Sequence, residues 1–193
     1  MTKYDREIEE LKSALVYAYQ NWEIWWFIRN EKYNYKTSYN KYLVFFNNSQ
    51  IAHFYTTIIT TWQLLDKKNI SIIKLYNKLC NDSALNENIK RDIDERLNGI
   101  DHIKKGIILI RHNVIAHISE NIDAHDVFEK AMIDGWDIRN IIVQLGNILN
   151  IMIDAIGQRP LAFTLVCRGD KPDEIMNDTD IKNLFDDLEK MTK

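Results

Sequence analysis

Glycine, proline and cysteine are scarce in this sequence. Six glycines and two prolines in 193 residues leave few of the turns that a β-rich fold requires, which favours long helices. The two cysteines, Cys80 and Cys167, are too few for a cysteine-based zinc site. We expect both to be reduced and to act as small apolar side chains.

Long apolar runs are also missing. No stretch approaches the roughly 18 uncharged apolar residues that a membrane-spanning helix needs, and the N-terminal residues 1–15 are charged and amphipathic, unlike a secretory signal. We therefore expect a cytoplasmic protein that has no membrane partner.

A strong excess of one charge sign is absent from the chain as a whole, whose net charge is -3. The acid is concentrated from Asp170 onward, where the net charge is -4, while residues 1–169 carry +1. The chain is therefore not a polycation, and an RNA partner requires a local basic patch. We interpret the acidic segment as a solvated helix face. The alternative is that it mimics RNA over a basic cleft or contacts a partner protein.

Helical periodicity is what the sequence does contain. It predicts an all-α fold, a bundle of four or more helices with short accessory helices, in which residues 1–158 form the bundle. Residues 159–193 form a C-terminal extension, within the same domain or appended to it. The only β-like run is 161–166. The helices are expected, with caps at Asn48 or Ser49 and at Ser83, over residues 5–29, 49–66, 71–79, 85–118, 126–133, 134–157 and 179–191.

The longest predicted helix carries an apolar stripe with a step of about 3.7 residues, close to the α-helical period. Two glycines, Gly99 and Gly106, share one edge of it and predict a close approach by another helix or a ligand, because glycine otherwise costs helix stability. The stripe consists of Leu85, Ile89, Ile93, Leu97, Ile100, Ile103, Ile107, Ile110, Val114 and Ile118.

Two histidines, an arginine and an asparagine interrupt this stripe near its end. At about 100° per residue, Arg111 and His117 fall about 60° to either side of Val114 and border the apolar seam. His112 points to the opposite, exposed face, and Asn113 lies on the His117 flank. His112 and His117 lie too far apart around the helix to chelate one metal ion, so we expect no metal and no cofactor.

An arginine and a histidine at one edge suit cleavage of RNA. Histidine exchanges protons near neutral pH, and arginine binds phosphate through two parallel hydrogen bonds. His117 would act as general base or acid when a 2'-hydroxyl attacks the neighbouring phosphate, and Arg111 would stabilise the developing charge. Lys104, on the Arg111 edge, is a candidate phosphate contact. The alternative is a half-exposed histidine bonded to a carbonyl and an arginine in a surface ion pair.

Other aromatic and histidine residues are assigned structural roles. We expect Trp22, Trp25 and Trp26 in the core or a dimer interface, the alternative being that they stack on RNA bases. We expect His53 to be a hydrogen-bonded core residue and His102 and His125 to be surface residues.

The segment from Arg111 to His117, Arg-His-Asn-Val-Ile-Ala-His, resembles the HEPN superfamily motif, in which an arginine is followed after four to six residues by a histidine. The ending Ile-Ala-His resembles the abortive-infection, or phage-defence, branch of that superfamily. Residues 45–79 are similar to the same branch in an apolar helix, a Leu-Asp-Lys turn and a Ser-Ile helix. The resemblance covers roughly Asp5 to Asp154.

This resemblance implies a homodimeric helical bundle that acts as a metal-independent endoribonuclease, as a toxin or phage-defence effector with RNA as substrate and an antitoxin as a further partner. It implies that Arg111 and His117 of two protomers meet in a cleft. It also identifies His112 as the polar residue after the arginine and Asn113 as a second polar position. Ser119 stands where many members of the branch have an acid.

The alternative is a non-catalytic HEPN module that binds RNA, a nucleotide or a partner protein. The weak positive charge of residues 1–169 favours it, because channels that hold RNA need a basic lining. The complete Arg/His pair favours the ribonuclease.

Overall fold

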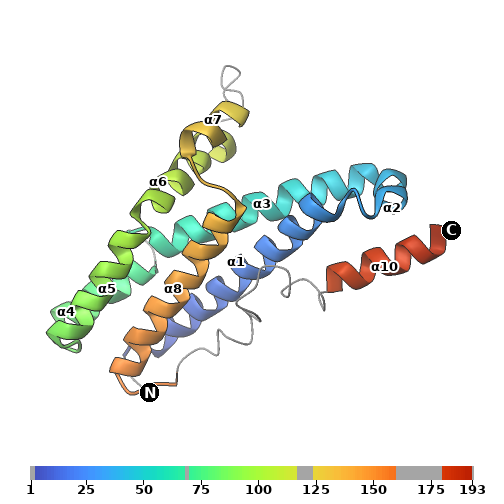
Figure 1. Ribbon diagram of the computed structural model, residues 1–193. Helices are drawn as coiled ribbons and strands as arrows, with labels where there is room; N and C mark the ends of the chain where they lie inside the picture. Colours follow the sequence, from blue (N-terminus) through green and yellow to red (C-terminus); the bar gives the residue numbers. More distant parts are fainter. Residues whose placement is uncertain (1–2, 68–69, 117–123, 160–179, 193) are drawn as a thin grey trace.

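The structure, a computed structural model, describes residues 3–67, 70–116, 124–159 and 180–192. Every regular element within these ranges is helical, which confirms the predicted all-α fold (Figure 1). The elements are α1 (Asp5–Glu31), α2 (Lys36–Lys41), α3 (Leu43–Leu65), α4 (Ile72–Asn81), α5 (Glu87–Gly99), α6 (Asp101–Ile110), the π-helix η1 (Arg111–Ala116), α7 (Ala124–Ala131), α8 (Gly135–Ala155) and α10 (Asp180–Thr192).

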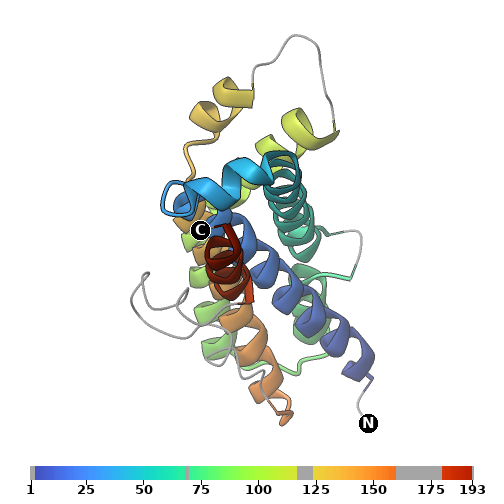
Figure 2. The ribbon, with the colours of Figure 1, turned by 90° about the vertical axis from the view of Figure 1, so that its right-hand side faces the viewer.

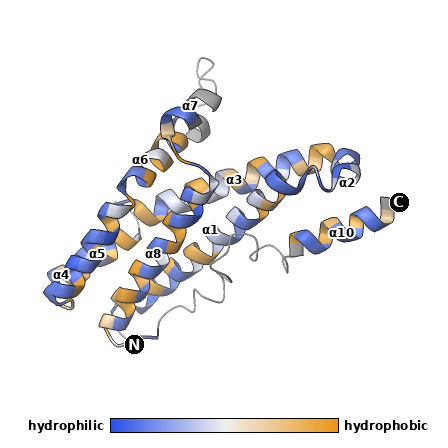
Figure 3. Ribbon diagram, viewed as in Figure 1, coloured by the Kyte–Doolittle hydropathy of each residue, from blue (hydrophilic) through white to orange (hydrophobic). Residues whose placement is uncertain are grey.

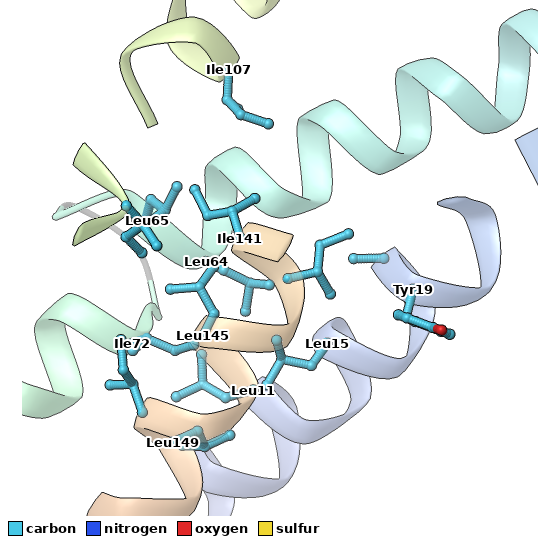
Figure 4. Close-up of a cluster of buried hydrophobic side chains, with 14 of the residues drawn as sticks. Leu11, Leu15, Tyr19, Leu64, Leu65, Ile72, Ile107, Ile141, Leu145 and Leu149 are labelled. Atoms are coloured by element: carbon cyan, nitrogen blue, oxygen red, sulfur yellow. The ribbon is translucent and has the colours of Figure 1, made fainter. Parts of the chain in front are cut away.

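The main core lies between α1, α3, α8 and the α5–α6 arm. The long helices bury stripes of apolar residues between them (Figure 3), and this burial stabilises the bundle. Helix α3 also carries apolar residues on its outer side, such as Val44 and Ile51. Within the described residues no helix is both long and apolar enough to cross a membrane. The close-up in Figure 4 shows the centre of this core, which includes Leu11, Leu15, Leu64, Leu145 and Leu149.

Tryptophans close the core between α1 and α8. Trp22 and Trp25 are buried, and the indole Nε1 of Trp22 donates to the Gly135 carbonyl oxygen at 2.7 Å. Trp26 packs on Trp22 and on Trp136, and a Cβ at Gly135 would overlap the Trp26 ring. The core assignment is therefore confirmed for Trp22 and Trp25, which are inaccessible to RNA bases.

Several helix boundaries agree with the sequence. Ser71 caps α4 by accepting a hydrogen bond from the Lys74 N–H, and Asp134 forms a capping box with Asp137 at the start of α8. Helix α8 ends before Gly157, whose φ of +71° is a left-handed conformation suited to glycine.

Two predicted caps are wrong. Helix α3 already begins at Leu43, after Tyr42, without a side-chain cap, so Asn48 and Ser49 lie inside it. Helix α5 is capped by Asn86, whose side chain accepts from the Ile89 N–H, and not by Ser83, which has a φ of 54°. A polar residue caps a helix only where the backbone leaves helical geometry, and a short polar stretch in the sequence does not show at which residue that happens.

The predicted continuous helix over 85–118 is also wrong. The apolar stripe is buried as expected, for example at Ile93, Ile103 and Ile107, but the helix is interrupted at Ile100, with φ -101° and ψ 4°. Gly99, a weak helix former, precedes this break. After Ile110 the helix continues as the π-helix η1.

The two glycines on this arm have different surroundings. A Cβ on Gly106 would lie 2.7 Å from Cγ2 of Ile133 and 2.9 Å from the Ala131 carbonyl oxygen, which confirms the predicted close approach. A Cβ on Gly99 would meet nothing within 4 Å, so a close approach at Gly99 was wrongly predicted.

This difference predicts opposite effects for the same substitution. Gly106→Ala should lower the free energy of unfolding by about 1–3 kcal/mol, because the backbone of Ala131 must move. Gly99→Ala, the matched control, should raise it by about 0.5–1 kcal/mol, because alanine restricts the unfolded chain. Urea denaturation of both variants measures the difference, and destabilisation of equal size in both would contradict it.

A second, smaller cluster joins the C-terminal helix to the bundle. Phe185 of α10 is fully buried against Phe27 of α1 and Phe46 of α3. The Tyr35 hydroxyl donates to Asp186 at 2.6 Å, and the Ser38 hydroxyl donates to Glu189 at 2.6 Å. Helix α10 therefore packs on α1 and α2 (Figure 2), and its apolar residue Phe185 faces the bundle.

The predictions for the other histidines and for the cysteines are tested where the structure describes these residues. His53 is hydrogen-bonded through Nδ1 to the Asn21 Oδ1 at 2.7 Å, and its partial burial lowers its pKa. His102 is exposed, and Cys80 is a free, half-buried thiol. Cys167 and the β-like run 161–166 lie outside the described residues, and nothing is described of the His125 side chain.

Candidate functional site

The predicted site residues lie where α6 changes into η1. The Arg111 backbone N–H donates to the carbonyl oxygens of Ile107 and Ile108, so Arg111 is still anchored to the regular end of α6. The residues that follow adopt π-helical hydrogen bonding. This geometry is rare in proteins as a whole, but where it occurs it is often part of a functional site. In Figure 2 this turn lies beside α3, with which it is in contact.

The side chain of Arg111 rests on an aromatic ring of α3. Its guanidinium carbon is 4.2 Å from the centroid of the Trp62 ring, within the range of a cation–π interaction. Both residues are half-buried. The charge is therefore held at the surface of the bundle, beside the apolar core, as the helical positions predict.

His112 is exposed, as predicted, but its ring is not separated from Arg111. The two side chains are in contact, with Nη1 of Arg111 and Nδ1 of His112 at 3.4 Å. A guanidinium has only donors, so Nδ1 is the acceptor in this long hydrogen bond. His112 therefore supports the orientation of Arg111 only weakly.

Asn113 and Lys104 lie on the same arm. The Asn113 side-chain amide donates to the Leu109 carbonyl oxygen at 2.9 Å, which directs the amide back along its own helix. Lys104 is half-buried on α6, before Arg111. The contacts of the described residues do not join Lys104 to Arg111, so its role as a phosphate contact stays a prediction.

His117 lies outside the described residues, directly after η1. The π-helix nevertheless changes one expectation about it. Its hydrogen bonds reach one residue further than those of an α-helix, so each residue turns by less than about 100°. The bearing of His117 relative to Arg111 therefore does not follow from regular α-helical geometry.

The sequence prediction missed Trp62. Its signal is the outward stripe of α3, in which Ile51, Tyr55 and Trp62 recur at helical spacing and are exposed or half-buried. Helical periodicity shows such a stripe, but it cannot show that the end of another helix lies against it.

Comparison with protein families matches residues 1–166 to the HEPN family AbiU2. The match includes every residue of the predicted site and ends before α10. No curated protein and no solved structure matches the chain.

Proposed function

This chain belongs to the AbiU2 family, an abortive-infection family of HEPN type, and from that premise we propose that it is a metal-independent endoribonuclease of phage defence. Arg111 and His117 of two protomers form the active site in a cleft between them. The activity operates in the cytoplasm on RNA, and an antitoxin restrains it.

The observation that carries this proposal is the surroundings of the Arg111 guanidinium. Its guanidinium is fixed in place by Trp62, and among the described residues no carboxylate forms an ion pair with it, in contrast to Arg6 and Arg96. An arginine that is held in place and has no counter-ion among the described residues favours an anionic ligand such as a phosphate group.

The chemistry needs only these two kinds of side chain. One His117 accepts the proton of a ribose 2'-hydroxyl, whose oxygen forms a bond to the adjacent phosphorus. The bond from phosphorus to the 5'-oxygen breaks, and the second protomer's histidine protonates that oxygen. Arg111 stabilises the extra negative charge on the phosphoryl oxygens. The products are a 2',3'-cyclic phosphate and a 5'-hydroxyl.

The expected result is cleavage of total cellular RNA by the purified protein in the presence of EDTA, because a histidine pair supplies both proton transfers. Mapping of the RNA ends should find cyclic phosphates upstream and hydroxyls downstream of each cut. A strict requirement for added divalent metal, or 5'-phosphate ends, would overturn the mechanism.

A second candidate is a HEPN module that binds RNA, a nucleotide or a partner protein without cleaving. The net charge of -3 favours it, because a protein that holds RNA along a channel usually carries an excess of basic residues. RNA binding without any cleavage, in the assay above, is the result that this candidate predicts.

A further inference from the structure

The contact between Arg111 and Trp62 is the closest approach of a cation to a ring in the described part of the chain. The guanidinium lies 4.2 Å from the ring centroid, while the other pairs lie at 5.2–5.9 Å. Several of those pairs are sequence neighbours, such as Lys32 and Tyr33. The Arg111–Trp62 pair instead joins the end of α6 to α3.

This contact restricts Arg111 without neutralising it. A free arginine side chain samples many rotamers, and fixing it costs conformational entropy. A carboxylate would fix it too, but would occupy the N–H donors that a phosphate needs. A ring that covers one face of the guanidinium leaves the donors along its edge available.

We propose that Trp62 is a positioning residue that directs the Arg111 guanidinium toward an RNA phosphate. This inference rests on the proposed function for the identity of the ligand. Arg111 is then held at both ends: its backbone N–H is bonded to α6, and its guanidinium lies on Trp62. The phosphate binds to an arginine whose direction is already set, which lowers the entropy cost of binding.

The test separates action through Arg111 from direct contact with RNA. All proteins in this test carry His117→Ala, so that the probe is not cleaved. In this background, Trp62→Leu is made once with Arg111 present and once together with Arg111→Ala. The probe is a fluorescein-labelled single-stranded oligouridylate, and its binding is measured by anisotropy at low ionic strength. Tyr55→Leu, on the same face of α3, is the matched control.

We expect Trp62→Leu to weaken binding by about tenfold when Arg111 is present, and to have no effect once Arg111 is alanine. Trp62→Phe should lose less, because a smaller ring still attracts the cation, and Tyr55→Leu should bind as the parent protein does. An equal loss in both Arg111 backgrounds would show direct stacking on RNA and overturn the proposal. Unchanged binding when Arg111 is present would overturn it as well.

The same variants in protein with His117 intact give a kinetic readout. Trp62→Leu should lower kcat as well as raise KM, because a misdirected guanidinium also stabilises the transition state less well. A change in KM alone would count against positioning. Thermal unfolding identifies a variant that fails to fold, in which case Trp62→Phe carries the test.

Failure of the proposed function gives a different pattern. If the wild-type chain cleaves no RNA while the binding effect of Trp62 still depends on Arg111, the ribonuclease assignment falls and the positioning role stands. If the wild-type chain cleaves RNA and the Trp62→Leu variant binds and cleaves RNA equally well, only the positioning role is wrong.

Discussion

The variant His117→Ala is expected to lose RNA cleavage by about two to four orders of magnitude, the range that a general acid or base contributes. One substitution changes both copies in the proposed dimer, so proton removal from the 2'-hydroxyl and proton delivery to the 5'-oxygen are lost together. The loss should appear in kcat, because a missing proton carrier affects the chemical step more than substrate binding.

Arg111→Ala is expected to lower cleavage by about a hundredfold to a thousandfold, as for removal of a group that stabilises transition-state charge. Arg111→Lys should recover only part of the activity. Lysine keeps the charge, but it lacks the planar fork that matches a phosphate and stacks on Trp62. The ordering wild type, lysine, alanine is thus part of the prediction.

Two surface residues provide matched controls for these variants. His102 is an exposed histidine of α6, and Arg91 is an exposed arginine of α5. Alanine at either position should leave cleavage unchanged. Circular dichroism and light scattering should show that all four alanine variants keep the helicity and the dimeric state of the wild type. Full cleavage by His117→Ala would remove the assignment of the active site.

The positions of the long helices could be predicted well from the sequence, because each one buries a stripe of apolar residues. Helix α1 was expected over residues 5–29 and runs over Asp5–Glu31, and α10 was expected over 179–191 and runs over Asp180–Thr192. In both, burial follows the helical period, as at Leu11, Leu15 and Phe185. The signal is the repeat itself.

The interruption at Ile100 and the π-helix could not be predicted in this way. In the sequence the apolar stripe from Leu85 onward runs through both features without a change of spacing, and its residues on either side of the break, such as Ile93 and Ile103, are buried alike. The choice between α and π geometry depends on tertiary contacts of η1 with α3 and α7, which a period of about 3.7 residues cannot contain.

The candidate site shows the same limit at the level of side chains. The helical angle indicated that Arg111 borders the core, and the structure agrees. It also placed His112 on the exposed face, which is confirmed, but it could not show that Nδ1 of His112 lies 3.4 Å from Nη1 of Arg111. The contact with Trp62 joins residues that are distant in sequence, so only the packing of α3 against η1 shows it.

Phe185→Ala is expected to detach α10, with a loss of about 3–5 kcal/mol in the stability of its docked state, as for other buried phenylalanines. The Phe185 ring is fully buried and lies 4.4 Å from the Phe46 ring and 5.1 Å from the Tyr35 ring, centroid to centroid. A helix of 13 residues is only marginally stable by itself in water, so α10 depends on this contact.

Hydrogen exchange measures the effect where it should occur. Backbone amides of α10 should exchange much faster in Phe185→Ala, while those of α8, in the main core, should keep their protection. Leu184→Ala is the matched control, because Leu184 is the sequence neighbour and is 42% exposed. Its effect should stay within about 0.5 kcal/mol. Unchanged exchange in α10 of Phe185→Ala would contradict its role as the anchor.

The same variant decides what the acidic C-terminal helix does for activity. Helix α10 packs on α1 and α2, and its Asp186 and Glu189 are hydrogen-bonded to Tyr35 and Ser38. Because these acids are engaged away from η1, RNA cleavage by Phe185→Ala should equal that of the wild type at a temperature where both are folded. Faster cleavage would instead support the alternative, in which the acidic segment covers the cleft and its release exposes Arg111 to RNA.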